Sequence, residues 1–268
     1  LGLERLRWLP EMAPGPHVLV NIPAFRLYAF EHPEEAGPPA LEMAVVVGEA
    51  ARNETPVFAD RMQYLVFSPY WYPPRSIIEE EILPALDRDP GYLDRKAFEL
   101  VASTSDDARA VPPTGDNLEK LRAGSLRVRQ RPGAQNSLGH VKFIFPNSFN
   151  VYLHDTPSRG LFRREERDFS HGCIRVERPI ELALWVLRDQ PEWTRETIES
   201  AMRADRPRHV PLRNQLPIYI LYSTVLARPD GGVGFFEDIY GYDPPLDQAL
   251  RGAETTTAAV ERSGPAAP

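Results

Sequence analysis

The sequence has one cysteine, Cys173, among its 268 residues. A disulfide within the chain is therefore excluded, and the closely spaced cysteine pairs of structural zinc sites are absent. A lone cysteine leaves two interpretations open: a reactive nucleophile, or an inert buried thiol, which is the commoner fate. One cysteine is also compatible with an oxidising compartment, because it cannot form a wrong bridge within its own chain.

Basic charge, long apolar runs and phosphate loops are also scarce. The formal net charge is −7 and the pI is about 5.5, which argues against the basic surface of a nucleic-acid binder. The longest apolar candidate, residues 218–227, has about half the length that a membrane span needs. The glycines of residues 231–234 precede no helix pattern, so they form no dinucleotide fingerprint. We expect no nucleic-acid partner, no metal and no cofactor.

Enough apolar material is present for a core. Hydrophobic residues make up 42% of the chain, which could form one large domain or two small ones. The chain begins at Leu1 and shows no signal peptide. We expect it to be a piece of a longer protein, in which case the missing signal says nothing about its compartment.

Cys173 needs a base if it is to act as a nucleophile. A thiol near its free pKa is mostly protonated at neutral pH, and it attacks a carbonyl well only when a base or an imidazolium assists. His171 lies two positions from Cys173 and would crowd it, whereas His154 lies 19 positions upstream. His154 is therefore the predicted base.

The residues before His154 alternate like a half-buried strand. Val151 and Leu153 are predicted to face inward, which leaves Tyr152 and His154 on the other face. Asp155, or its backbone carbonyl, could orient the imidazole by accepting the Nδ1 proton.

Gly172 allows the backbone to approach a substrate closely, and the amides of Gly172 and Cys173 could point at a developing oxyanion. A zinc site built from His154, Asp155, His171 and Cys173 is an alternative, but the tight ligand pairs of such sites are missing.

The spacing carries a resemblance to a known family. Fifteen residues separate His154 from the sequence Ser170-His171-Gly172-Cys173, and this pattern resembles the signature of the L,D-transpeptidases, the YkuD-type cysteine enzymes of bacterial cell-wall synthesis. Flanking phrases resemble the large YcbB-like branch: 151–157, 167–177, 20–23, 74–78 and 239–243. The similarity spans about residues 15–245. Arg175 stands where many members carry asparagine, a departure that concerns acceptor-side contacts rather than the chemistry.

The predicted fold is mainly β, a curved or barrel-like mixed sheet with peripheral helices and an α-helical insertion. We assign residues 17–68 and 126–245 to the catalytic domain, and residues 69–125 to an inserted capping subdomain beside the cleft, as the resemblance implies. Residues 1–16 are read as a linker from a preceding segment, and residues 246–268 as a disordered tail.

Three local patterns sharpen this outline. Ser76 and Glu79 are spaced as a capping box that starts a helix. Residues 126–130 alternate as a strand that resumes the main sheet, with Arg127 and Arg129 outward. Residues 230–232 are a hairpin signal.

The resemblance implies acyl transfer between peptidoglycan stem peptides. Cys173, activated by His154, would attack the carbonyl of the third residue of a tetrapeptide stem and expel D-alanine. A side-chain amine of a neighbouring stem would then take the acyl group, giving a 3→3 cross-link. Tyr152, Ser170, His171 and Arg175 are the predicted substrate contacts. The resemblance also implies covalent inhibition by carbapenems, and we expect a monomer in the periplasm or cell envelope.

Two rival functions use the same residues differently. Water could meet the acyl-enzyme, giving an L,D-carboxypeptidase or endopeptidase. A non-catalytic wall-binding module would need neither a thiol nor a base, so the presence of both Cys173 and His154 argues against it. A papain-like protease would place cysteine before histidine in the chain, and here the order is reversed.

Overall fold

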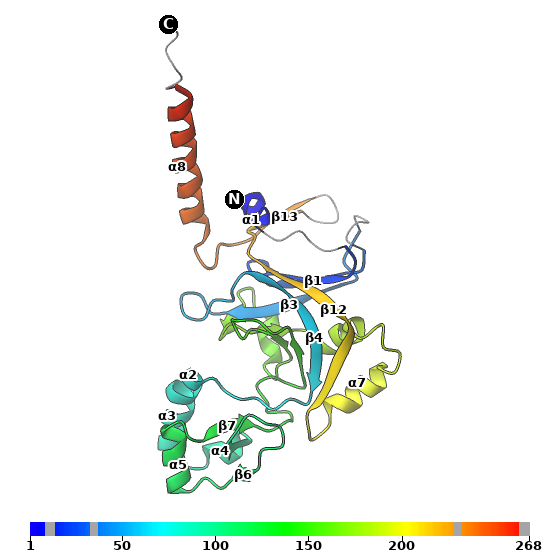
Figure 1. Ribbon diagram of the computed structural model, residues 1–268, viewed down its shortest axis with the longest axis vertical. Helices are drawn as coiled ribbons and strands as arrows, with labels where there is room; N and C mark the ends of the chain where they lie inside the picture. The colour runs from blue at the N-terminus through cyan, green and yellow to red at the C-terminus, as the bar shows by residue number, and fades with distance from the viewer. Residues whose placement is uncertain (9–13, 33–36, 228–231, 263–268) are drawn as a thin grey trace.

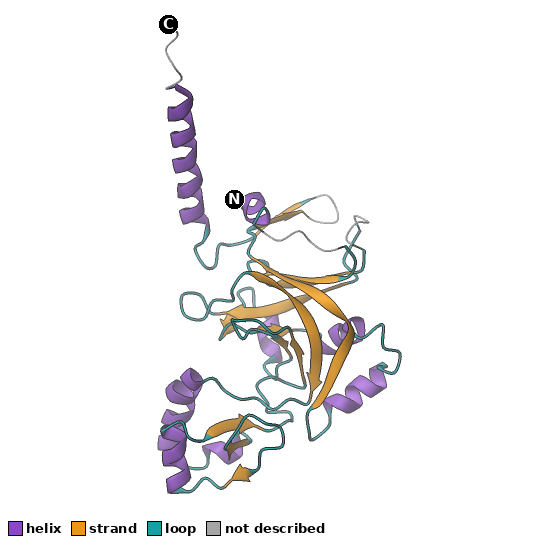
Figure 2. Ribbon diagram, viewed as in Figure 1, coloured by secondary structure: helices purple, strands orange, loops and turns teal. Residues whose placement is uncertain are grey.

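A mixed β-sheet that closes on itself forms the body of the computed structural model, which describes residues 1–8, 14–32, 37–227 and 232–262 (Figures 1 and 2). The strand order is β10-β3-β11-β9-β8-β4-β12-β1-β2, and β2 also pairs with β3, which closes the ring. The predicted mainly β, barrel-like fold is confirmed. The strands of this sheet are β1 (His17–Asn21), β2 (Arg26–Phe30), β3 (Leu41–Gly48), β4 (Phe58–Phe67), β8 (Val141–Ile144), β9 (Leu153–His154), β10 (Asp168–Ser170), β11 (Ile174–Val176) and β12 (Arg208–Leu221).

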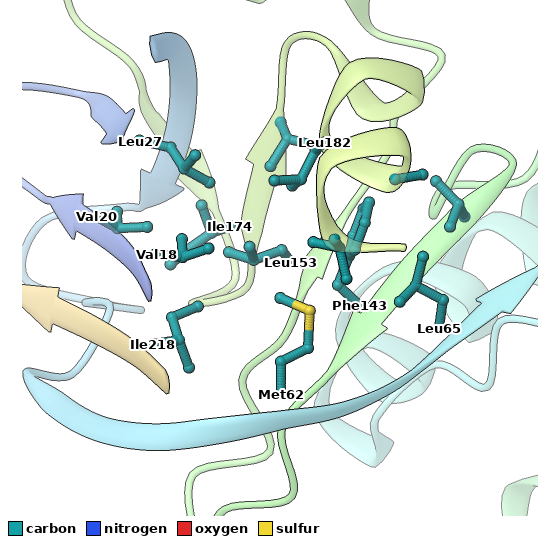
Figure 3. Packing of buried hydrophobic residues seen from close by; sticks show 14 of the residues in the cluster. Val18, Val20, Leu27, Met62, Leu65, Phe143, Leu153, Ile174, Leu182 and Ile218 are labelled. Carbon is teal, nitrogen blue, oxygen red and sulfur yellow. The ribbon is translucent and has the colours of Figure 1, made fainter. Parts of the chain in front are cut away.

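The core lies inside this closed sheet. Figure 3 shows Val18, Met62, Phe143 and Leu153 meeting there from four different strands, and all four are buried. Helix α6 (Pro179–Val186) packs into the same cluster through residues such as Leu182. Aliphatic and aromatic side chains on alternate strand positions thus bring β8, β9 and β11 together.

Two helices, α6 and α7 (Arg195–Met202), follow strand β11 in the chain. Helix α6 begins with proline at its first position, where a missing N–H costs nothing, as predicted. Helix α7 is capped by Thr194, whose side chain accepts a hydrogen bond from the Thr197 amide. Ile198 of α7 is fully buried in the main core.

The inserted subdomain has its own core and its own sheet, seen at the bottom of Figure 1. Strand β7 (Arg127–Gln130) pairs with β5 (Phe98–Val101) in this sheet rather than with the main sheet, so the insertion extends beyond residue 125. Arg129 is buried and its Nε donates to Glu99 at 2.6 Å, which corrects its predicted outward position. The remaining elements are β6 (Ala110–Val111), α2 (Arg75–Ile77), a π-helical turn (Ile78–Ile82), α3 (Leu83–Arg88), α4 (Tyr92–Arg95) and α5 (Gly115–Arg122).

The predicted capping box in this insertion is wrong. The helical stretch begins at Arg75, with Pro74 rather than Ser76 at the N-cap position and no side-chain cap, so Ser76 already lies inside the helix. Glu79 instead pairs with Arg75 Nε at 2.6 Å, one helical turn away.

At the N-terminal end, residues 2–6 form α1 (Gly2–Leu6), and Arg5 of this helix pairs with Asp243. The C-terminal end differs from the prediction. Helix α8 (Asp243–Arg262) occupies most of the segment predicted to be disordered, because prolines near its start and alanines along it favour a helix even without large apolar groups. The hairpin strands β13 (Val225–Ala227) and β14 (Val233–Phe235) pair, while most of the predicted turn between them falls outside the described residues. Among the described helices, none has the length and hydropathy of a membrane span.

Candidate active site

Three adjacent strands carry the predicted catalytic segments. Lys142 of β8 is the register partner of His154 of β9, which is in turn the partner of Arg175 of β11. Residues directly opposite one another in a sheet point to the same face. Leu153 and Ile174, their neighbours in the chain, point into the core in Figure 3. Lys142, His154 and Arg175 therefore share the opposite face.

His154 is buried and held in one tautomer. Its Nδ1 lies 2.5 Å from the backbone carbonyl oxygen of Asp155, and because a carbonyl can only accept, Nδ1 carries the proton. Burial lowers the pKa of His154 to about 3, and the positive charge of Arg175 adds to this effect. The imidazole is thus neutral near pH 7, with Nε2 available as a base.

Cys173 lies beside Tyr152 at the start of β11. The Ile174 amide donates to the Tyr152 carbonyl oxygen at 3.1 Å, which fixes this alignment, and the Cys173 thiol donates to the Asn150 carbonyl oxygen at 3.7 Å. Burial raises the pKa of the Cys173 thiol, and hydrogen bonding with Tyr152 and the nearby positive charges of Arg175 and Lys142 partly offset this. The resting thiol is therefore protonated at neutral pH.

The thiol and the imidazole meet on one face without a direct bond. The rings of Tyr152 and His154 are 5.8 Å apart between centroids, and Cys173 adjoins Tyr152. Within the described part of the chain, no hydrogen bond joins Cys173 to His154. Catalytic hydrogen bonds are often long before substrate binds, so the lack of this bond does not argue against the predicted pair.

The loop before Cys173 is shaped by Ser170. This side chain is buried, donates from Oγ to the Cys173 carbonyl oxygen at 2.5 Å, and accepts from the Gly172 amide at 3.2 Å. Ser170 therefore holds the loop rather than facing a substrate, which corrects its predicted role. The Gly172 amide is occupied in this structure, so the Cys173 amide is the remaining oxyanion donor of the predicted pair. Gly172 has φ +101°, a conformation that favours glycine.

The side chains of Asp155 and His171 point to other partners. The Asp155 carboxylate accepts from the His140 amide at 2.9 Å and lies 3.3 Å from Arg159, so Asp155 orients His154 by its carbonyl and not by its carboxylate. His171 Nε2 lies 3.1 Å from Oε1 of Glu81 in the inserted subdomain. His171 thus joins the two parts of the molecule at the edge of the site.

Sequence reasoning missed three contributors to the site. Lys142 lies opposite His154 in the sheet. The alternation of residues 141–144 could have predicted that Lys142 faces away from the core. Asn150 has φ +55° and contacts Cys173 through its carbonyl, where the sequence predicted a strand residue. Thr55, fully buried, donates from Oγ1 to the Gly172 carbonyl oxygen at 2.8 Å, a link of 117 positions that no local pattern indicates.

No group of three or more His, Cys, Asp or Glu side chains is placed to hold a metal ion in the described ranges of the chain. The ionisable groups that the structure brings to this face are a thiol, a neutral imidazole and two cationic side chains.

The sequence of residues 15–207 matches the profile of the L,D-transpeptidase catalytic domain (YkuD). The chain belongs to this family. A Haemophilus influenzae protein named for L,D-transpeptidase activity is 32% identical over 250 residues, which is 93% of this chain and 48% of that protein. The chain thus spans about half the length of the curated relative that it matches.

Solved structures resemble this domain more distantly. L,D-transpeptidase 3 from Mycobacterium tuberculosis, in complex with a faropenem-derived adduct, is 14% identical, with a TM-score of 0.34 over 78% of this chain and 60% of that chain. Bd1075 from Bdellovibrio bacteriovorus is 14% identical, with a TM-score of 0.30 over 92% of this chain and 59% of that chain.

Proposed function

We propose that this domain transfers an acyl group from a peptidoglycan tetrapeptide stem to the amine of a neighbouring stem, and that it does so as a monomer in the periplasm or cell envelope. The observation that carries the proposal is the placement of Cys173 beside the strand of His154, on one face, in a chain of the L,D-transpeptidase family. A lone thiol next to a neutral, oriented imidazole is the minimum equipment for nucleophilic acyl transfer.

The first half-reaction forms a thioester. His154 Nε2 accepts the thiol proton as Cys173 Sγ attacks the carbonyl carbon of the third stem residue. The tetrahedral intermediate collapses by breaking the C–N bond, and the leaving D-alanine amine takes the proton from His154. The Cys173 amide supports the oxyanion during this step.

The second half-reaction forms the cross-link. The incoming side-chain amine loses a proton to His154 as it attacks the thioester carbonyl. The C–S bond then breaks, and the departing sulfur regains that proton. The enzyme returns to its starting state, and the product is a 3→3 cross-linked dimer.

Product analysis tests the proposal. Disaccharide-tetrapeptides are incubated with the wild type and with Cys173→Ala, and the products are identified by mass spectrometry. The proposal expects a dimer that has lost one D-alanine, formed by the wild type alone. A disaccharide-tripeptide as the sole product would support hydrolysis instead, and unaltered substrate would count against both reactions.

Carbapenems provide a second test of the same thiol. A β-lactam carbonyl is a strained electrophile that needs no second substrate, and membership of the L,D-transpeptidase family supports the expectation. Intact-mass measurement of the wild type should show one covalent adduct, located on Cys173. An adduct of equal yield on Cys173→Ala would contradict the proposal.

A further inference from the structure

Two cationic side chains flank His154 in one row across the sheet. Lys142 and Arg175 are the register partners of His154 on either side, so all three project toward the face where Cys173 lies. Lys142 Nζ is 5.9 Å from the centroid of the Tyr152 ring, and the side chain of Tyr152 interacts with Cys173. Both cations therefore border the space in which the scissile carbonyl must be placed.

These cations lack anionic partners. No carboxylate lies within ion-pair distance of Lys142 or Arg175 among the residues that the structure describes, and Arg175 Nε is buried without any hydrogen-bond partner. Asp106 is the carboxylate whose charge acts on Lys142, but its Oδ2 atom already lies 2.8 Å from Nε2 of His209. Burial lowers the pKa of both Lys142 and Arg175, a sign that each pays a desolvation cost.

The protein's own thiol does not account for this arrangement. An unpaired cation that is largely removed from water is destabilising, and the cost is offset when an anion arrives. The Cys173 thiol is neutral in the resting enzyme because burial raises its pKa. Even as a thiolate it would carry one negative charge, which balances only one of the two positive charges of Lys142 and Arg175. The chain is acidic overall, with a net charge of −7, so this positive pair is a local feature.

We propose that Lys142 and Arg175 form a subsite for a carboxylate, and that its occupant is the free carboxylate of the leaving residue of the donor stem. The inference rests on the proposed function, which makes that residue a terminal D-alanine. Its carboxyl carbon is three bonds from the scissile carbonyl carbon, a separation of about 4 Å. A carboxylate held by these cations therefore places the scissile bond at Cys173. The subsite selects stems that end at the fourth residue, because a longer stem has an amide at this position.

Two matched donors test the subsite. One is the disaccharide-tetrapeptide, and the other is the same compound with its terminal carboxylate converted to a carboxamide. Intact-mass measurement gives the rate of acyl-enzyme formation with each donor. We expect the wild type to prefer the carboxylate donor by about ten- to a hundredfold, the range for a hydrogen-bonded charge.

Variants then assign the preference to residues. In Lys142→Met and in Arg175→Met the ratio of the two rates should fall severalfold, whereas Lys142→Arg should keep it. Any change in thiol reactivity alters both rates alike and cancels in the ratio. Lys120→Met, which removes the charge of an exposed lysine in α5, is the matched control and should keep the wild-type ratio.

The outcomes separate this inference from the proposed function. A wild type that is acylated by neither donor contradicts the proposed function itself. Equal acylation of both donors, or a preference that survives in both methionine variants, overturns the subsite. The same comparison can be made for the second step, with an acceptor stem whose terminal carboxylate is converted to a carboxamide. If only this second step prefers the carboxylate, the cations bind the acceptor, and the assignment to the donor is overturned.

Discussion

At the scale of single residues, the site depends on two groups that are both uncharged at rest. Burial lowers the pKa of His154 to about 3 and raises the pKa of Cys173. Between these limits the pair exists as thiol and neutral imidazole rather than as thiolate and imidazolium. In the proposed mechanism His154 therefore acts as a base during the reaction, because no ion pair with Cys173 is formed beforehand.

This arrangement predicts a pH profile. Alkylation of Cys173 by iodoacetamide requires the thiolate, so its rate should rise about tenfold per pH unit between about pH 5 and pH 8. The sign follows from the raised pKa of the thiol: each unit of pH below that pKa removes nine-tenths of the thiolate. Protonation of His154 adds no further acidic limb in this range, because its pKa lies near 3. A rate that stays constant from pH 6 to pH 8 would show a preformed ion pair.

At the scale of elements, a buried hydroxyl ties together three segments that are distant in sequence. Thr55 Oγ1 accepts from the Gly48 amide at 2.9 Å and donates to the Gly172 carbonyl oxygen at 2.8 Å. The Tyr240 hydroxyl accepts from the Thr55 amide at 3.2 Å and donates to the Gly48 carbonyl oxygen at 2.7 Å. The end of β3 and the segment before α8 thereby position the loop that carries Cys173.

Thr55→Val should test this connection. The substitution keeps the shape of the side chain but leaves a buried amide and a buried carbonyl unpaired, so we expect the free energy of unfolding to fall by about 2 kcal/mol. The acylation rate should fall as well, because the loop loses its support. Thr55→Ser retains the hydroxyl and should lose less on both measures, in thermal unfolding and in acyl-enzyme formation. Equal losses in the two variants would show that the methyl group, and not the hydroxyl, matters.

Some features of these elements could be predicted from the sequence, and others could not. The alternation of Val151 and Leu153 with the residues beside them was sufficient to place Tyr152 and His154 on one face, whereas the catalytic roles of Cys173 and His154 stay predictions. The pairing of β7 with β5 was not accessible, because an alternating strand does not reveal which sheet it joins. The role of Ser170 was hidden for a similar reason, since a hydroxyl that closes a loop looks the same in sequence as one that binds a substrate.

At the scale of the whole molecule, the inserted subdomain reaches the nucleophile loop. His171, two residues before Cys173, lies 3.1 Å from Glu81 of the insertion, and both side chains are about half exposed. An exposed contact of this kind contributes little to stability, roughly 0.2–1 kcal/mol. We expect its position to matter more than its strength, because the contact joins the insertion to the loop at the edge of the site, where it would limit the entry of water.

Glu81→Gln should therefore change the products more than the stability. We expect thermal unfolding to be nearly unaffected, while the ratio of hydrolysed tripeptide to cross-linked dimer increases because water reaches the thioester more readily. Glu80→Gln, an exposed neighbour in the same π-helical turn, is the matched control. An unchanged product ratio in Glu81→Gln would mean that the insertion does not control water at this site.

The proposed reaction requires that Cys173 carries the acyl group and that His154 acts as its base. The most direct measurement is the intact mass of the protein after brief exposure to a disaccharide-tetrapeptide. We predict an added mass equal to the donor minus D-alanine, located on Cys173, absent from Cys173→Ala and formed far more slowly in His154→Gln. D-alanine release without this adduct, or an adduct that forms at the wild-type rate in His154→Gln, would contradict the account.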